Sequence, residues 1–261
     1  MNGFQSTRKI KADTALACSM RTIRRRLQEN GYFHRIPAEK EILKAQHKEQ
    51  RLAFALEHLV WDREWNVTIF SDEKVFNTDE NGRVTLWRLR GTRYAEENVR
   101  FRQRSGRITL GFWGCMSSHG PGPLVRTTPH MNSEEYIQIL SDVILPYIAE
   151  TFPGIPYVNF IQDNSGVHRA RAVQNWLAAQ PNLRTLNWPA KSPDMNLIEN
   201  LWGIIVQNWE PQIQTREALA QYVSDQWEGL RARPDLFNNL IASMPQRLTA
   251  VIENEGSVTR F

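Results

Sequence analysis

The sequence predicts an α/β protein in which helices flank a mixed β-sheet. Apolar runs of strand length fill the middle of the chain, and amphipathic stretches of helix length alternate with the later runs. The first strands follow one another in hairpin order, and helices separate the later ones. This order favours antiparallel pairs joined to parallel ones. In such sheets, functional groups gather at the ends of the central strands.

The composition is that of a chain with a sizeable core. Its 261 residues are 41% hydrophobic, which suits one large domain or two. No apolar run reaches the roughly 20 residues that a transmembrane helix needs, so we expect no membrane partner. Cys18 and Cys115 match no zinc-site spacing. We interpret both as small buried hydrophobic residues of a protein from a reducing compartment.

The charge is distributed unevenly along the chain. Residues 1–51 hold 12 lysines or arginines against 5 acidic residues, whereas the remainder holds 20 against 23. A basic front on a nearly neutral body favours an anionic partner such as nucleic acid. A solvated helical surface would show the same pattern, and the charge alone does not separate the two interpretations.

The front of the chain has a helical pattern. Residues 9–31 are typical of helix, turn and helix, with Ser19 as an N-cap and Ile23 and Leu27 on one apolar face. Residues 38–59 predict a second amphipathic helix. Four arginines surround the apolar face of the first segment, and they are candidate DNA contacts: Arg21, Arg24, Arg25 and Arg26.

The body of the chain carries the strands and the remaining predicted helices. Apolar or alternating runs predict strands at 66–72, 83–89, 107–116, 123–128, 157–163 and 183–187. Helical periodicity predicts helices at 133–150, 168–179 and 195–209.

Two of these strands end in an acidic residue. Side chains alternate between the faces of a strand, so Asp72 shares a face with Phe70 while Glu73 points away. Asp163 ends another strand. If the two strands are neighbours, Asp72 and Asp163 can meet side by side, and their charges repel unless a cation or proton lies between them. An acid at the end of a strand is also commonly a solvated turn residue.

A third acid lies on a predicted helix. Residues 198, 201, 202 and 205 form its buried stripe, and Glu199 lies next to that stripe. A helix packed on the sheet can therefore direct Glu199 at the strand ends. Oxygen ligands suit Mg²⁺ or Mn²⁺, and two such ions can support an in-line phosphoryl displacement.

Other polar residues have two interpretations each. His168 could contact DNA phosphate, shape the acid site or simply pack near a helix start. Asp194 follows Ser-Pro and is interpreted as the N-cap of the helix that carries Glu199. Arg102 and Arg104 lie in a basic loop that suits phosphate contacts, although a solvated loop would have the same composition.

Motifs around these acids resemble the catalytic core of Tc/mariner superfamily DNA transposases, in the branch with an Asp-Asp-Glu triad. The resemblance covers about residues 19 to 210. It rests on these stretches: Ile69-Phe70-Ser71-Asp72-Glu73, Ile161-Gln162-Asp163-Asn164 with His168, Trp188-Pro189, Ser192-Pro193-Asp194 and Ile198-Glu199-Asn200-Leu201-Trp202.

The resemblance implies an RNase H-like mixed five-stranded sheet with Asp72, Asp163 and Glu199 as catalytic metal ligands. It implies two Mg²⁺ or Mn²⁺ ions, hydrolysis at transposon ends and attack of the freed 3′ hydroxyl on a TA step in target DNA. The implied partners are double-stranded DNA with terminal inverted repeats and a second copy of the chain. In a eukaryote the implied location is the nucleus.

The front of the chain departs from the family pattern. Residues 9–31 resemble only the end of the second of two helix-turn-helix units, so we expect most of the N-terminal DNA-binding region to be absent. We expect a partial helix-turn-helix segment at 1–36, a helical linker at 37–65 and a catalytic domain at 66–261. A truncated or domesticated DNA-binding protein without catalysis is the alternative function.

Overall fold

The computed structural model describes residues 7–14, 17–32, 42–78, 108–208 and 215–261. The chain divides into two compact units, Met1–Lys40 and Glu41–Phe261. The boundaries at 36 and 65 that we expect from the sequence stay predictions. Within the described ranges, no helix has the length and apolar character needed to cross a bilayer.

The first unit contains two helices, α1 (Thr7–Thr14) and α2 (Met20–Glu29). Ser19 is the N-cap of α2, as predicted, and its hydroxyl accepts a hydrogen bond from the backbone N–H of the third helical residue. Ile10 and Ile23 are buried in this small unit.

The second unit is built on a five-stranded mixed sheet with the order β3-β2-β1-β4-β5. The antiparallel pairs join β1 to β2 and β2 to β3, and the parallel pairs join β1 to β4 and β4 to β5. The strands are β1 (Thr68–Asn77), β2 (Thr109–Ser117), β3 (Gly120–Thr127), β4 (Val158–Ile161) and β5 (Leu183–Thr185).

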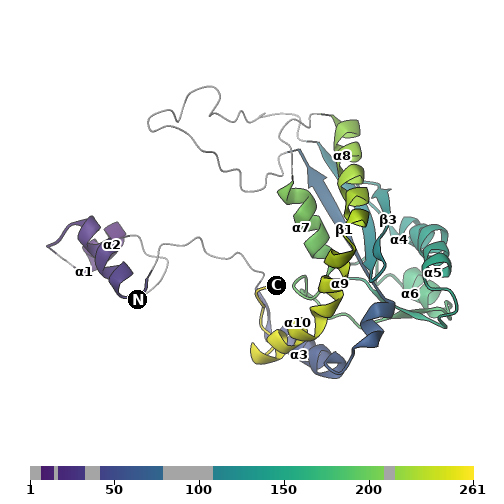
Figure 1. Ribbon diagram of the computed structural model, residues 1–261, viewed down its shortest axis with the longest axis horizontal. Helices are drawn as coiled ribbons and strands as arrows, with labels where there is room; N and C mark the ends of the chain where they lie inside the picture. Colours follow the sequence, from purple (N-terminus) through teal and green to yellow (C-terminus); the bar gives the residue numbers. More distant parts are fainter. Residues whose placement is uncertain (1–6, 15–16, 33–41, 79–107, 209–214) are drawn as a thin grey trace. The chain divides into compact units, whose positions relative to one another are not determined.

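Helices cover both faces of this sheet (Figure 1). One core joins Ile69 and Trp113 to α4 (Ser133–Ile139), a π-helical segment (Leu140–Ile144), α5 (Leu145–Thr151) and α6 (Arg171–Ala178). The opposite core joins Phe70 and Phe112 to five other helices: α3 (Ala45–His58), α7 (Ile198–Gln207), α8 (Arg216–Gly229), α9 (Pro234–Ala242) and α10 (Met244–Glu253). The neighbours Ile69 and Phe70 therefore face different cores, as strand alternation requires.

The predicted strands and helices of the body agree with these elements, with shifted ends. The helix predicted at 195–209 begins at Ile198, and the one predicted at 168–179 begins at Arg171. The strand predicted at 83–89 lies outside the described residues. The sequence pattern predicts no element beyond residue 209, where the structure has α8, α9 and α10. Cys115 is buried as expected, whereas Cys18 is partly exposed.

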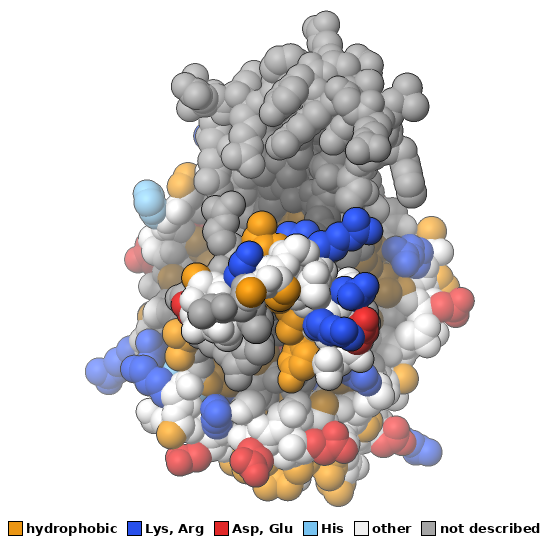
Figure 2. Space-filling view, turned by 90° about the vertical axis from the view of Figure 1, so that its left-hand side faces the viewer, with side chains coloured by type: hydrophobic (Ala, Val, Ile, Leu, Met, Phe, Trp, Pro, Cys, Tyr) orange, Lys and Arg blue, Asp and Glu red, His pale blue; other side chains and the backbone are white. Residues whose placement is uncertain are grey.

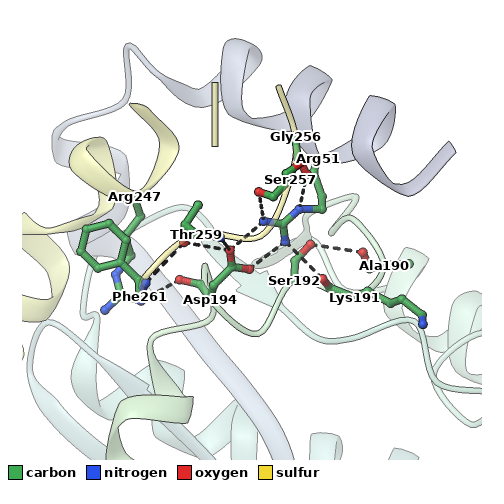
Figure 3. A network of polar contacts seen from close by, with 10 residues as sticks. All are labelled: Arg51, Ala190, Lys191, Ser192, Asp194, Arg247, Gly256, Ser257, Thr259 and Phe261. Atoms are coloured by element: carbon green, nitrogen blue, oxygen red, sulfur yellow. Dashed lines mark hydrogen bonds and ion pairs between the residues drawn. The ribbon is translucent and has the colours of Figure 1, made fainter. Parts of the chain in front are cut away.

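A buried ion pair joins α3 to the loop before α7. The guanidinium of Arg51 donates two hydrogen bonds to the carboxylate of Asp194, each 2.7 Å long, and neither side chain is more than 1% exposed (Figure 3). Arg51 also donates to the carbonyl oxygens of Lys191 and Gly256. The backbone N–H and hydroxyl of Thr259 donate to Asp194. These hydrogen bonds tie α3, the loop and the C-terminal tail together.

This network corrects the interpretation of Asp194 as a helix N-cap. Leu197 occupies the N-cap position of α7 and makes no side-chain cap hydrogen bond. The Asp194 carboxylate is instead occupied by Arg51 and Thr259. Burial opposes its charged form, but these donors outweigh burial and hold the pKa of Asp194 below its ordinary value.

Substituting Arg51→Met should destabilise the second unit by about 3–5 kcal/mol, because it leaves the Asp194 carboxylate buried without its cation. Urea denaturation measures the free energy of unfolding. Glu228→Gln is the matched control, since it removes an exposed ion pair. The side chain of Glu228 is 62% exposed and that of its partner Arg231 is 51% exposed, so this substitution should cost less than about 1 kcal/mol. Equal costs for the two substitutions would contradict a dominant role for the buried pair.

Candidate active site

The strand that carries Asp72 and the strand that leads to Asp163 are neighbours, which is the condition for the two acids to lie side by side. β1 and β4 run parallel, and their register pairs Phe70 with Ile161. Asp72 and Asp163 each lie two residues beyond this pair, so they are level with each other. Asp163 follows the end of β4, whereas Asp72 lies inside β1, which continues to Asn77 and does not end at residue 72 as the sequence pattern predicts. The strand pairing therefore brings the two acid-bearing segments side by side.

Asp72 lies on the face of the sheet that α7 covers. The indole N–H of Trp202 donates a hydrogen bond to its carboxylate at 3.1 Å. Burial, followed by the nearby charges of Glu199 and Glu73, raises the pKa of Asp72 to about 8, although the Trp202 hydrogen bond opposes this. The side chain therefore stands in a partly buried environment that already contains negative charge.

Glu199 lies in the first turn of α7, next to the buried stripe formed by Ile198, Leu201, Trp202 and Ile205. This is the placement that the helical periodicity predicts. Burial raises the pKa of Glu199, and the positive charge of Lys74 opposes the rise. Because Glu199 acts on the pKa of Asp72, the structure brings these two acids into one site.

Asp163 belongs to a second group of side chains at the same edge. Its carboxylate lies 2.7 Å from Nδ1 of His168 and accepts a hydrogen bond from the backbone N–H of Ser165 at 2.8 Å. The other ring nitrogen of His168, Nε2, lies 3.0 Å from the carboxylate of Glu73. His168 is 1% exposed, so it forms a buried link between Asp163, just beyond the end of β4, and Glu73, inside β1.

The charges in this second group reinforce one another. Burial opposes protonation of the imidazole, but the hydrogen bonds and charges of Asp163 and Glu73 outweigh it and raise the pKa of His168 to about 10. Burial also acts against the Asp163 carboxylate, yet His168 and Ser165 hold the pKa of Asp163 below its ordinary value. The group is a carboxylate–imidazolium–carboxylate cluster at neutral pH.

The same three side chains have ligand atoms within 4.8 Å of one another, a spacing that would also suit a metal ion. A doubly protonated imidazole has no lone pair to offer a metal. We therefore interpret Glu73 and His168 as residues that support Asp163. The side chain of Asp163 is 50% exposed, so its carboxylate remains accessible from solvent.

The predicted DNA contacts have different surroundings. Arg102 and Arg104 lie outside the described residues. His168 is buried in the acid cluster, so its contact with DNA stays a prediction. The arginines of α2 are all exposed. Figure 2 shows lysine and arginine side chains in blue on the side that faces the viewer. The exposed arginines of α2 are Arg21, Arg24, Arg25 and Arg26.

Sequence reasoning missed two contributors to this site. Strand alternation predicts that Glu73 points away from Asp72 and so gives it no role, but on that other face its carboxylate contacts His168. Trp202 was assigned to the core, where it lies, but its indole N–H also holds Asp72. The signal that could have identified Glu73 is its place on the face of β1 opposite Asp72, where a buried histidine such as His168 needs an acidic partner. The side-chain amide of Asn164, the residue after Asp163, donates a hydrogen bond to the carbonyl oxygen of Trp188 at 2.7 Å.

Family comparisons agree with this geometry. A family described as DDE superfamily endonuclease matches residues 67–220, and a helix-turn-helix family described as Transposase, of the Tc3 type, matches residues 2–60. The second match extends on both sides of the segment 9–31 on which the sequence resemblance rests.

Individual relatives cover nearly the whole chain. The Tc1 transposase of Caenorhabditis elegans is 32% identical over 246 residues, which are 93% of this chain and 88% of the relative. The Tc3 transposase of the same organism is 31% identical, and the matched region is 100% of this chain and 78% of the relative. The Mos1 mariner paired end complex with Mn has the same fold, with a TM-score of 0.81 at 18% identity over 99% of this chain and 77% of the solved one. The chain is therefore a Tc/mariner family DNA transposase with an RNase H-like catalytic fold.

Proposed function

We propose that this transposase cuts DNA with a divalent metal held by Asp72, Asp163 and Glu199, and then joins the freed 3′ hydroxyl to target DNA at a TA step. The observation that carries the proposal is that Asp72 on β1, which senses the charge of Glu199 on α7, lies level with Asp163 just beyond the neighbouring strand β4. Burial and charge repulsion there raise the pKa of Asp72 to about 8. The domesticated, non-catalytic alternative has no comparable observation in its favour.

The residues at this edge fit Mg²⁺ or Mn²⁺. The three proposed ligands are carboxylates, the donors that these hard cations prefer. A cation among them would offset both the cost of burying the Asp72 charge and the repulsion from Glu199. Two bound ions would activate the attacking oxygen and stabilise the leaving oxygen of an in-line displacement. Similar Mos1 paired end complexes were solved with Mn and with Mg.

The remaining residues prepare the carboxylates for this task. His168 holds one oxygen of Asp163, so that the carboxylate keeps a fixed direction and stays ionised. Trp202 fixes Asp72 through its indole N–H. Glu199 is carried on a helix whose buried stripe is locked in the core, so its main chain has little freedom. The chain therefore supplies orientation and charge, and no side chain needs to form a covalent intermediate with DNA.

The proposed partner is double-stranded DNA with terminal inverted repeats. The exposed arginines of α2 would contact phosphates and hold the duplex. Because the similar Mos1 structure is a paired end complex, we propose that two copies of this chain hold two ends. If the source is eukaryotic, the reaction belongs in the nucleus.

The raised pKa of Asp72, which comes from burial and then from the charges of Glu199 and Glu73, gives a test that needs no DNA. An ordinary aspartate ionises near pH 3.8, while Asp72 ionises near 8, so between these values the folded state keeps a proton that the unfolded state releases. Wild-type stability should therefore fall as pH rises through this window. Asp72→Asn lacks that penalty and should be more stable than wild type by about 2–4 kcal/mol at pH 8.5, and by less at pH 5.

Denaturant unfolding in EDTA at both pH values measures this difference. The control is Glu253→Gln, an exposed substitution on α10, which should change stability by less than about 0.5 kcal/mol. A destabilised Asp72→Asn at pH 8.5 would count against the repulsion between the acids.

Cleavage is the direct test of the proposed reaction. A duplex ending in the inverted repeats that flank the reading frame should be cut in Mg²⁺ or Mn²⁺ and remain intact in EDTA. Asp163→Asn and Glu199→Gln should each lower the rate by about 10⁴-fold or more, because the acids act as a unit. Cleavage that persists in either variant would remove that residue from the triad. Metal-independent DNA binding without cleavage by the wild type would favour the non-catalytic alternative.

The arginines of α2 predict that DNA binding depends on salt. Replacing Arg24 and Arg25 with glutamine should weaken binding to all sequences and reduce the slope of log K against log salt by about 0.9 for each phosphate that is no longer neutralised. Fluorescence anisotropy across a salt series measures the slope. Replacing Arg216 and Arg233, two exposed residues of the second unit, with glutamine is the charge-matched control, and an equal effect there would refute a specific role for α2.

A further inference from the structure

A buried serine links the three chain segments that carry the proposed catalytic acids. Ser71 immediately precedes Asp72 on β1. Its hydroxyl donates a hydrogen bond of 2.7 Å to the carbonyl oxygen of Ile161, two residues before Asp163. Its own carbonyl oxygen accepts a hydrogen bond of 3.2 Å from the side-chain amide of Asn196, which lies three residues before the helix-borne acid.

All the groups in this link are shielded from water. Ser71 is 1% exposed, Asn196 is 5% exposed and Ile161 is fully buried. Hydrogen bonds in such surroundings are costly to leave unmade, because neither partner finds water when the bond breaks. The link is therefore a rigid part of the sheet edge.

The link between β1 and β4 occurs where the strand ladder stops. The backbone register between these strands ends at the pair of Phe70 with Ile161, while β1 continues beside β2 as far as Asn77. Beyond this point, the backbone ladder no longer fixes the distance between the segment with Asp72 and the segment with Asp163. The Ser71 hydroxyl adds a bond to β4 at that position.

The link to α7 compensates for a helix start without a cap. Leu197 at the N-cap position makes no side-chain hydrogen bond to the first turn. The start of α7 is held instead by contacts with other segments, among them the hydrogen bond from Arg247 to the side chain of Asn200. The Asn196 amide ties the residue before the cap to the β1 backbone. This hydrogen bond fixes the position of the first turn of α7, which carries Glu199, relative to the β1 backbone next to Asp72.

We infer that Ser71 and Asn196 are positioning residues that hold Asp72, Asp163 and Glu199 at the mutual spacing needed to bind the divalent metal. Neither side chain has to touch metal or DNA, since each acts through the acid-bearing segment that it fixes. The inference rests on the proposed metal-dependent function. It adds two residues to which neither the charge pattern nor the acid triad assigns a role.

The test compares Mn²⁺ binding by the full chain and its variants, using isothermal titration calorimetry. Ser71→Ala removes the hydroxyl donor, and Asn196→Leu removes the amide at similar volume. Each should weaken Mn²⁺ binding by about 10-fold, the usual effect of removing a group that orients a metal ligand. Single-turnover cleavage should slow by a similar factor while the Kd for DNA stays unchanged.

Ser117→Ala is the matched control. Ser117 is also a buried serine of the sheet, and its hydroxyl bonds to that of Tyr147 on α5, in a different part of the fold. It should lower the melting temperature to a similar extent and leave Mn²⁺ affinity unchanged. If leucine at 196 prevents folding, Asn196→Ser removes the same donor with a smaller side chain.

The outcomes separate this inference from the proposed function. If wild type binds Mn²⁺ and Ser71→Ala and the Asn196 variant bind it equally well, the inference is overturned and the triad stands. An equal loss of affinity in Ser117→Ala would also overturn it, because the effect would then be general destabilisation. If wild type binds no Mn²⁺, or Asp72→Asn binds it as tightly, the proposed function itself fails.

Discussion

The parallel pairing of β1 with β4 is the constraint on which the active site depends. It places strands separated by some eighty residues of chain next to each other with their carboxyl ends at one edge, and both carry an acid just beyond the paired segment. Every other feature of the site is arranged around that edge. α7 packs against β1 and adds Glu199, while His168 connects Glu73 of β1 to Asp163 beyond β4. A shift of register by one residue would send Asp72 to the wrong face.

Much of this site was readable from the sequence because it depends on periodic patterns. Strand alternation separated Asp72 from Glu73, and helical periodicity placed Glu199 at the border of the buried stripe. Both are local rules, and they hold wherever the element forms as predicted. The mixed sheet followed from the order of hairpins and crossovers, which the chain displays directly.

The parts that sequence reasoning missed depend on long-range contacts. Asp194 looks like a helix cap because it follows Ser-Pro, but its partner Arg51 lies 143 positions away and decides its role. The helices after residue 209 complete the core against α7 and the sheet, and their pattern alone does not show that. His168 suited either DNA or the acid site, and only the neighbouring strand end of Glu73 decides which contacts the buried ring makes.

The ion pair of Arg51 also has a consequence for how the protein is made. Arg51 bonds to the carbonyl oxygen of Gly256, 205 positions later in the chain. At ordinary rates of synthesis, about 10–40 s pass between the two residues leaving the ribosome. Asp194 is synthesised within that interval, but the carbonyl of Gly256 and the donors of Thr259 that complete the network come later. The loop before α7 therefore gains its full set of hydrogen bonds only after the segment from Gly256 to Thr259 has been synthesised.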